Sequence, residues 1–187
     1  MSWGRITLVL QDPSWRKPPG LPQKLKAAAT AGLKASGLPR GACFTILLAD
    51  DARLRALNRQ FRGKDRPTNV LSFPAAPNRE DFIGRAAGRK AALRSAPHSE
   101  RSTLFLADAP YVGDIALAYG VARDEAKAAG KRLCDHAAHL VVHGVLHLAG
   151  FDHQKPREAE RMEGREVEIL AGLGIADPYR VAKAAVR

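Results

Sequence analysis

The sequence predicts a single domain, spanning residues 1–187, in which short strands alternate with amphipathic helices. A chain of 187 residues fits one domain with a sizeable core. It is 45% hydrophobic and 26% charged, which is typical of a soluble globular protein. Short apolar runs between turn residues indicate strands, and apolar positions at three- to four-residue spacing indicate helices. No apolar run is long enough to cross a membrane, so we expect no membrane partner.

The first two strands and the helix between them are expected in that order. The runs ITLVL at 6–10 and CFTILL at 43–48 are short and apolar, and the second reads as a buried strand. Between them, the residues from Pro22 to Ser36 have a helical pattern, which Gly37 ends.

The second helix is expected over residues 51–62. Asp50 or Asp51 can accept hydrogen bonds from the first N–H groups of this helix, and Gly63 can end it. The apolar side chains on one face, which we expect to dock the helix on the sheet, are Leu54, Leu57 and Phe61.

The third and fourth strands flank a long segment of unusual composition. Pro67 breaks the chain before the run NVLSF, and a strand returns at 111–118. Residues 75–107 are rich in Ala, Arg and Pro and have no strand period, although a helix over 81–93 is compatible with them. We expect this segment to be a surface insertion and not a second domain.

Three more helices are expected in the last third of the chain, at residues 121–129, 133–148 and 156–173. The last one is amphipathic and rich in Glu and Arg. The residues of the middle helix that we assign to packing are Leu140, Val141, Leu146 and Leu148.

The charge of the chain favours a polyanionic partner. Thirty Lys and Arg against nineteen Asp and Glu give a net charge of +11 and a pI near 10.2. The excess is uneven, because residues 53–66 carry six basic side chains and one acidic one, whereas residues 107–153 carry four basic and six acidic. This distribution favours nucleic acid, although many ordinary proteins are also basic.

Cysteine usage and the N-terminal residues favour the cytoplasm. Cys43 and Cys134 are the only cysteines and do not form a C-x-x-C pair, so a reducing compartment is expected. The first residues lack the pattern of a signal peptide.

The stretch HGVLHLAGFDH, residues 143–153, places three histidines beside an apolar helix. His143 and His147 are four residues apart, so their rings project from the same face of a helix. Gly150 can adopt a left-handed conformation and reverse the chain, which would bring His153 to the other two. Three imidazoles suit one zinc ion per chain and leave a fourth position open for water, as in catalytic sites.

A competing metal site would use His139, His143 and Cys134. His139 is four residues before His143, but no turn would bring Cys134 to them. We expect His139 to support a metal ligand or to face the substrate.

The spacing of the three histidines is shared with metzincin peptidases, with one difference. Those peptidases carry Glu directly after the first His as the general base, and this chain has Gly144 there, which cannot transfer a proton. Peptide hydrolysis is therefore not expected. For RNA, both water and the neighbouring 2′-hydroxyl are available as nucleophiles, and the sequence leaves both open.

Three segments resemble the YbeY family of bacterial rRNA maturation factors, which are described as zinc-dependent endoribonucleases. The stretch HGVLHLAGFDH resembles the family's H-G-x-L-H-L-x-G-Y/F-D-H signature. LNRQFRGKDRPTNVLSFP, residues 57–74, is similar to its L-N-x-x-Y-R-x-x-x-x-P-T-D/N-V-L-S-F segment, and VGDIALA, residues 112–118, resembles its L-G-D-I strand. The resemblance runs from about Thr45 to Tyr179.

The chain departs from the family pattern at a few places. Phe61 and Phe151 stand where Tyr is common, which removes only hydroxyl groups. The segment at 75–107 is longer and more basic than is usual for the family, which affects the expected shape of the cleft rim.

The resemblance implies a small α+β fold with a mixed, mostly parallel four-stranded sheet and a metzincin-like active-site helix. It also implies zinc on His143, His147 and His153. The family's arginine corresponds to Arg62, whose guanidinium could bind two phosphate oxygens, although Arg62 is also an ordinary charge at a helix end. Asp152 would orient a metal-bound imidazole or accept a proton from water. The residues that could line the cleft are Thr68, Asn69 and Ser72.

We therefore expect a cytoplasmic, zinc-dependent endoribonuclease that cleaves single-stranded RNA in rRNA maturation and ribosome quality control. Its expected partners are rRNA and the small ribosomal subunit, with contacts to ribosomal proteins or assembly factors. One alternative is a non-catalytic ribosome-assembly factor with a structural zinc and a basic rRNA-binding face. Another is a different zinc hydrolase, including a peptidase, against which Gly144 argues.

Overall fold

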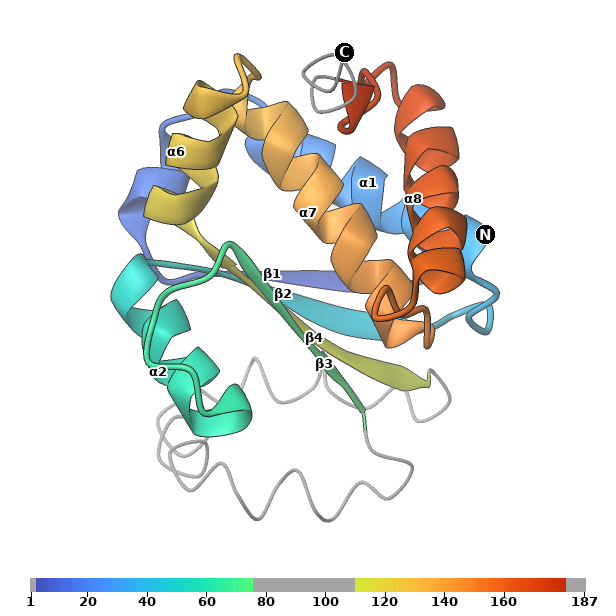
Figure 1. The fold of residues 1–187 in the computed structure, drawn as a ribbon, viewed down its shortest axis with the longest axis horizontal. Helices are drawn as coiled ribbons and strands as arrows, with labels where there is room; N and C mark the ends of the chain where they lie inside the picture. Colours follow the sequence, from blue (N-terminus) through green and yellow to red (C-terminus); the bar gives the residue numbers. More distant parts are fainter. Residues whose placement is uncertain (1–2, 76–109, 181–187) are drawn as a thin grey trace, which may run out of the picture.

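The computed structural model describes residues 3–75 and 110–180, which form a sheet with helices on both faces (Figure 1). The strands are β1 (Arg5–Leu10), β2 (Cys43–Ala49), β3 (Val70–Pro74) and β4 (Tyr111–Ala118). The helices are α1 (Leu21–Ser36), α2 (Asp51–Arg62), α6 (Tyr119–Ala128), α7 (Leu133–Leu148) and α8 (Pro156–Ala171), with a short 3₁₀ helix, η1, at Pro13–Arg16. Apart from Ala75, the expected insertion at 75–107 and the helix considered within it lie outside the described residues.

The sheet is mixed and mostly parallel, which confirms the expected α+β class. Its strand order is β1-β2-β4-β3. β1 and β4 both run parallel to β2, and β3 runs antiparallel to β4. Within the described residues, β3 therefore forms one edge of the sheet, and its outer side can line a neighbouring pocket.

The side chains of β4 alternate between two hydrophobic cores. Ile115 and Leu117 belong to the main core, which α1, α7 and α8 cover, whereas Ala116 and Ala118 pack with Leu54 of α2 on the other face. Figure 1 shows α2 on the side of the sheet opposite to α1, α7 and α8. The helix that ends in Arg62 and the helix that carries the histidines are thus separated by the sheet and approach each other around the edge formed by β3.

Helix α7 packs closely against α1 and against the sheet. A Cβ atom added at Gly32 of α1 would lie 3.1 Å from Val145 Cγ1, and one added at Gly144 would lie 2.8 Å from Ile115 Cδ1. Two glycines therefore allow α7 to approach α1 and the sheet at the same time. The predicted bounds of α7, residues 133–148, are confirmed.

The expected ends of α2 are also confirmed. Asp50 is the N-terminal cap, since its Oδ1 accepts a hydrogen bond from the N–H of Arg53 at 2.7 Å. Asp51 instead accepts a hydrogen bond from the N–H of Val121 at the start of α6. Gly63 has a φ of 68°, the left-handed conformation that ends a helix.

Phe61 contacts the sheet as predicted, but at the margin of the sheet and not in the core. Leu54 is buried and Leu57 packs beside it, but Phe61 is 47% exposed. Its ring lies edge-to-face on Phe73 of β3, with ring centroids 5.0 Å apart. The last turn of α2 therefore lies at the rim of the sheet, which brings Arg62 close to β3.

The sequence analysis did not predict η1. Its Trp15 is only 1% exposed, and the indole N–H donates to the backbone O of Ala49 at 2.9 Å. The ring therefore closes the core at the end of β2. Among the described helices, none is both long enough and apolar enough to span a membrane.

Candidate metal centre

Two histidines of α7 face each other one helical turn apart. The rings of His143 and His147 have centroids 4.6 Å apart, and their Nε2 atoms are 3.1 Å apart. This is the convergence that the four-residue spacing predicts.

The turn after α7 brings a third histidine to this pair. Gly150 has a φ of 86°, which allows the chain to reverse, and its N–H donates to the backbone O of His147 at 3.0 Å. The ring centroid of His153 lies 5.4 Å from that of His143 and 5.0 Å from that of His147. One nitrogen of each ring lies within 4.8 Å of the others, so the three residues could hold a metal ion.

Hydrogen bonds fix which nitrogen of each α7 histidine faces the centre. Nδ1 of His143 lies 2.8 Å from Oε1 of Glu166, and Nδ1 of His147 lies 3.0 Å from the backbone O of Phe151. An ionised carboxylate and a carbonyl oxygen can only accept, so both Nδ1 atoms carry a proton. The lone pairs of the two Nε2 atoms are then directed at each other, which is repulsive unless a cation lies between them.

The spacing of these nitrogens fits zinc. Zn–N bonds of about 2.0–2.1 Å in a tetrahedron place two ligand nitrogens roughly 3.3 Å apart. The observed 3.1 Å between the Nε2 atoms of His143 and His147 is close to that value. His153 lies on an exposed turn, so rotation of its side chain can bring its nitrogen to the same distance.

The electrostatics of the centre favour a neutral imidazole at His147. Burial lowers the pKa of His147 to about 4, and the neighbouring His143 and His153 act in the same direction. The carbonyl of Phe151 and the charge of Asp152 oppose this shift but do not outweigh it. His147 is therefore neutral near pH 7, which is the form that binds metal.

Behind His143 lies a buried carboxylate that the sequence analysis missed. Glu166 of α8 is 1% exposed and accepts hydrogen bonds from His143 Nδ1 at 2.8 Å, His139 Nε2 at 2.7 Å and the Tyr179 hydroxyl at 2.6 Å. Burial raises the pKa of Glu166, but the three hydrogen bonds outweigh burial and hold the pKa at about 2. Burial and the bond to Glu166 raise the pKa of Tyr179 well above its usual range.

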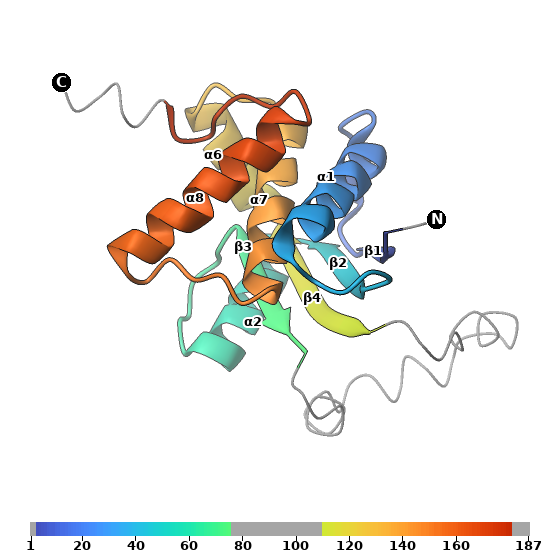
Figure 2. The same ribbon diagram turned by 90° about the vertical axis from the view of Figure 1, so that its right-hand side faces the viewer.

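The sequence did contain a signal for Glu166. It lies four residues after Met162 and three before Ile169, so it is on the buried face of the amphipathic helix α8. A carboxylate at such a position needs hydrogen-bond donors. Figure 2 shows α1, α7 and α8 on the same face of the sheet, and α7 supplies two of the donors.

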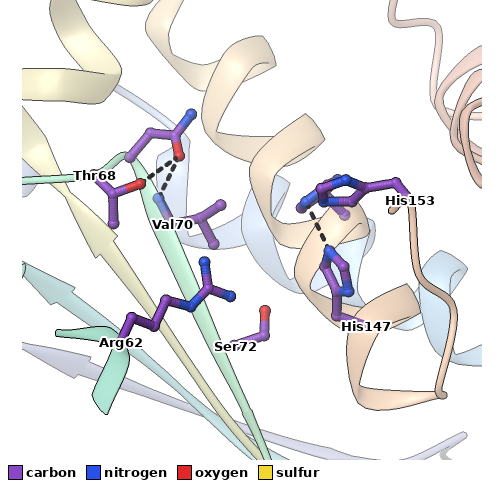
Figure 3. A pocket seen from close by; sticks show the side chains of 8 residues that line it. Arg62, Thr68, Val70, Ser72, His147 and His153 are labelled. Atoms are coloured by element: carbon purple, nitrogen blue, oxygen red, sulfur yellow. Dashed lines mark hydrogen bonds between the residues drawn. The ribbon is translucent and has the colours of Figure 1, made fainter. Parts of the chain in front are cut away.

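The opposite side of the centre contains Arg62. The three histidines and Arg62 line a pocket of about 200 Å³, together with residues of the α2–β3 connection and of β3. These are Thr68, Asn69, Val70 and Ser72. In Figure 3 the guanidinium of Arg62 is directed into the space between β3 and the histidines. All four residues that the sequence analysis assigned to this cleft, including Arg62, lie at the pocket.

Asn69 contributes to the shape of the pocket through its own hydrogen bonds. Its Nδ2 donates to Oε2 of Glu125 at 2.9 Å, and its Oδ1 accepts from the N–H of Val70 at 2.7 Å. The same Glu125 oxygen lies 2.8 Å from Nε2 of His136. Asn69 thereby ties the start of β3 to α6 and indirectly to α7.

Asp152 and the residues of the competing site lie differently. Oδ1 of Asp152 accepts from the N–H of His153 at 2.7 Å, so it shapes the turn that presents this histidine. His139 contacts Glu166, and Sγ of Cys134 points toward the backbone O of Pro19 at 3.8 Å. Within the described residues, the competing set with Cys134 is not assembled.

Gly144 faces the sheet and not the pocket. The nearest atoms to an added Cβ are all in Ile115, at 2.8 to 3.1 Å. A larger side chain at this position would therefore have to displace Ile115. The packing of α7 on β4 explains why a glycine follows His143, where the metzincin pattern has glutamate.

Comparisons with known proteins agree with this architecture. Residues 17–174 match the profile of the family described as "Endoribonuclease YbeY". The endoribonuclease YbeY of Azorhizobium caulinodans is 43% identical over 176 residues, covering 93% of this chain and 95% of the relative. That of Ruegeria pomeroyi is 43% identical over 175 residues, covering 93% and 97%. The solution structure of TM1509 from Thermotoga maritima has a similar fold, with a TM-score of 0.50 and 21% identity over 90% of this chain and 91% of that chain.

Proposed function

The chain belongs to the YbeY family, and from this premise we propose that it is a zinc-dependent endoribonuclease that cleaves single-stranded RNA. The observation that carries the proposal is the convergence of three histidine nitrogens in a pocket that also contains Arg62. A metal ion and a guanidinium on either side of one phosphodiester are a suitable arrangement for its cleavage.

In this proposal His143, His147 and His153 hold one zinc ion. When bound, zinc supplies Lewis acidity, which polarises a phosphoryl oxygen and lowers the pKa of water. A structural zinc has four protein ligands, whereas a catalytic one has three and keeps a position for water or substrate. The described residues offer three convergent side chains, beside an open pocket. This supports a catalytic metal over the alternative of an assembly factor with a structural zinc.

We assign Arg62 to the scissile phosphate. Its side chain is exposed, and among the described residues no carboxylate forms an ion pair with it. A guanidinium can donate to two phosphate oxygens at once. Negative charge grows on those oxygens during cleavage, so the contact would strengthen in the transition state and lower the barrier.

Cleavage requires one proton to be removed and another to be supplied. Water or the neighbouring 2′-hydroxyl attacks phosphorus and loses its proton, the P–O5′ bond breaks, and the leaving 5′ oxygen gains a proton. We assign Asp152 either to the acceptance of the first proton or to the support of a ligand. Its hydrogen bond to the N–H of His153 favours the supporting role.

The charge of α2 and the following loop supports RNA as the substrate. Six basic residues in this stretch are exposed, and they are Arg53, Arg55, Arg59, Arg62, Lys64 and Arg66. Asp65, the only acidic residue from 53 to 66, pairs with Arg55 through two hydrogen bonds of 2.8 and 3.0 Å. The other basic side chains remain available for the phosphate groups of an RNA strand.

We further propose that the substrate is rRNA and that the enzyme acts in the cytoplasm in rRNA maturation and ribosome quality control. The small ribosomal subunit, with its proteins or assembly factors, is the proposed partner. Residues 75–107 are proposed to be a surface insertion in a single domain that spans residues 1–187.

The test is metal analysis and RNA cleavage on the same preparations, with wild type beside His147→Ala. We expect about one zinc per wild-type chain and cleavage of single-stranded rRNA segments, and neither property in the variant. A zinc-loaded wild type that binds RNA tightly but does not cleave it would favour the assembly factor. Cleavage of peptides and not of RNA would favour another zinc hydrolase.

A further inference from the structure

We propose that Glu166 is a positioning residue for the metal centre, which holds the His143 ring so that its Nε2 faces the ion. Through Tyr179, the same carboxylate makes the C-terminal segment part of the support of that ring. The inference rests on the proposed function, because it takes His143 to be a metal ligand. It adds a residue from α8, a helix that contributes no ligand of its own.

The two oxygens of Glu166 have separate partners. Oε1 accepts from Nδ1 of His143 at 2.8 Å, while Oε2 accepts from Nε2 of His139 and from the hydroxyl of Tyr179. The carboxylate cannot rotate without breaking these three bonds, and at 1% exposure it has almost no access to water that could replace them. If the His143 ring rotated by half a turn, a ring carbon would face Oε1 in place of the Nδ1–H group, and the hydrogen bond would be lost. The ring is therefore held in one orientation.

The support of His143 differs from that of the other two histidines. His147 is held by a carbonyl of its own turn, that of Phe151, and His153 lies on an exposed turn. His143 is held by a full negative charge from another helix. A carboxylate on Nδ1–H fixes the tautomer and makes Nε2 a better electron donor to a metal.

The network continues into the segment after α8. The Tyr179 ring lies edge-to-face on His139, with centroids 5.8 Å apart, and its hydroxyl lies 2.6 Å from Glu166. Lys131 anchors the same segment, because its Nζ donates to the backbone O of Pro178 at 2.8 Å. Removal of the Tyr179 hydroxyl would take one donor away from Oε2 but leave the bond between Oε1 and His143.

A second carboxylate–histidine pair, between Glu125 of α6 and His136 of α7, provides a matched control. Oε2 of Glu125 lies 2.8 Å from Nε2 of His136, the same separation as in the pair of Glu166 and His143. His136 is not one of the three convergent histidines. Glu125 also accepts a hydrogen bond from Nδ2 of Asn69 at the pocket, so this control is read as zinc affinity and not as RNA cleavage. Its side chain is 41% exposed, so its neutralisation should disturb the fold little.

The experiment measures zinc affinity by competition with a chelator for wild type, Glu166→Gln, Glu125→Gln and Tyr179→Phe. The amide in Glu166→Gln can accept at only one of its two atoms, so we expect zinc affinity to fall by about 10- to 100-fold. Tyr179→Phe should lower it by roughly a few fold, and Glu125→Gln should leave it unchanged. In metal-free wild type, ¹⁵N NMR of the imidazoles should find the His143 proton on Nδ1, and in Glu166→Gln a mixture of tautomers.

The outcomes separate this inference from the proposed function. Wild type that binds zinc, with Glu166→Gln binding it equally well, overturns the inference alone. A His143 proton on Nε2 in metal-free wild type also overturns it. Wild type that binds no zinc overturns the proposed function, and the positioning role with it. If circular dichroism finds Glu166→Gln unfolded, the wild-type tautomer and the Tyr179→Phe affinity decide the question.

Discussion

The two sides of the pocket are built in opposite ways. The histidine wall is made of His143, His147 and His153. The first two stand on α7, which packs tightly against α1 and the sheet, and their rings are hydrogen-bonded in place. The basic wall consists of Arg62, which lines the pocket, and of Lys64 and Arg66, which follow it in sequence outside the pocket lining. All three are exposed, where α2 ends at the rim of the sheet. The rings of His143 and His147 are thus held in place before any ligand arrives, whereas the basic wall is open to water.

The difference matches what each wall is proposed to bind. A metal ion requires lone pairs at fixed distances, so its ligands must be oriented in advance. A flexible RNA strand is attracted over longer distances and can be met by mobile side chains, but exposed charges are screened by salt. Metal binding at the histidine wall should therefore respond to small packing changes and not to salt. RNA binding at the basic wall should respond to salt and not to small packing changes.

The largest effect is expected from the loss of two of the three histidines. His143→Ala combined with His153→Ala leaves one imidazole, which cannot hold zinc against a chelator, so tight binding and RNA cleavage should both be lost. Zinc content by atomic absorption is the measurement. His136→Gln, on the same helix but outside the cluster, should keep its zinc. Full zinc content in the double variant would contradict the metal site.

The second-largest effect is expected from a charge reversal at Arg62, which should leave the metal bound. Arg62→Glu should slow single-turnover cleavage at saturating RNA by roughly a hundredfold or more, because a charged donor to the phosphate is lost. Zinc content and folding should stay nearly normal. Arg59→Glu is the matched charge reversal one turn earlier, outside the pocket lining, and its rate should recover at saturating RNA. Cleavage by Arg62→Glu at the wild-type rate would exclude a catalytic role for Arg62.

The third effect is expected from a substitution that tests how tightly α7 packs on the sheet. Gly144→Ala improves helix propensity, but the added methyl would lie 2.8 Å from Ile115 Cδ1, and we expect a net loss of about 1–2 kcal/mol in the free energy of unfolding. Gly164→Ala on α8 is the control, because its Cβ would meet nothing within 4 Å and should stabilise the protein by about 0.5–1 kcal/mol. Urea denaturation measures both. Equal stabilisation by the two substitutions would show that α7 is not tightly packed.

The smallest effect concerns the salt dependence of the basic wall. Lys64→Ala and Arg66→Ala should each weaken RNA binding by roughly a few fold and reduce the slope of log K against log salt by about one. Zinc affinity should not change with either substitution. Measured RNA affinities that stay level between low and physiological salt would mean that these side chains are only solvated surface.

The features that the sequence predicted are those set by neighbouring residues. The bounds of α7, the four-residue spacing of His143 and His147, and the reversal at Gly150 depend on local periodicity and backbone conformation. The resemblance to the YbeY family, which the family profile and the relatives confirm, supplied two further expectations: the mixed sheet and the place of Arg62 at the cleft. Neither the order of distant strands nor the opposite wall of a pocket can be derived from local pattern alone.

The features that were missed depend on contacts between distant residues. Glu166 is one of many acidic residues in α8, and only its contact with His139 and His143 distinguishes it from the solvated ones. Trp15 bonds to Ala49, 34 positions away, and Phe61 is exposed because α2 ends at the rim of the sheet. Burial of a single residue is decided by tertiary packing, which periodicity predicts only on average.

The place of Glu166 after the proposed ligands in the sequence also bears on the order in which the metal centre is formed. Synthesis proceeds from the N-terminus, so Arg62 and all three histidines emerge before α8 and Tyr179. A growing chain that has reached residue 153 contains every proposed ligand but not the carboxylate that orients His143. The centre therefore acquires its final form only after α8 and Tyr179 have also been synthesised and have folded against α7.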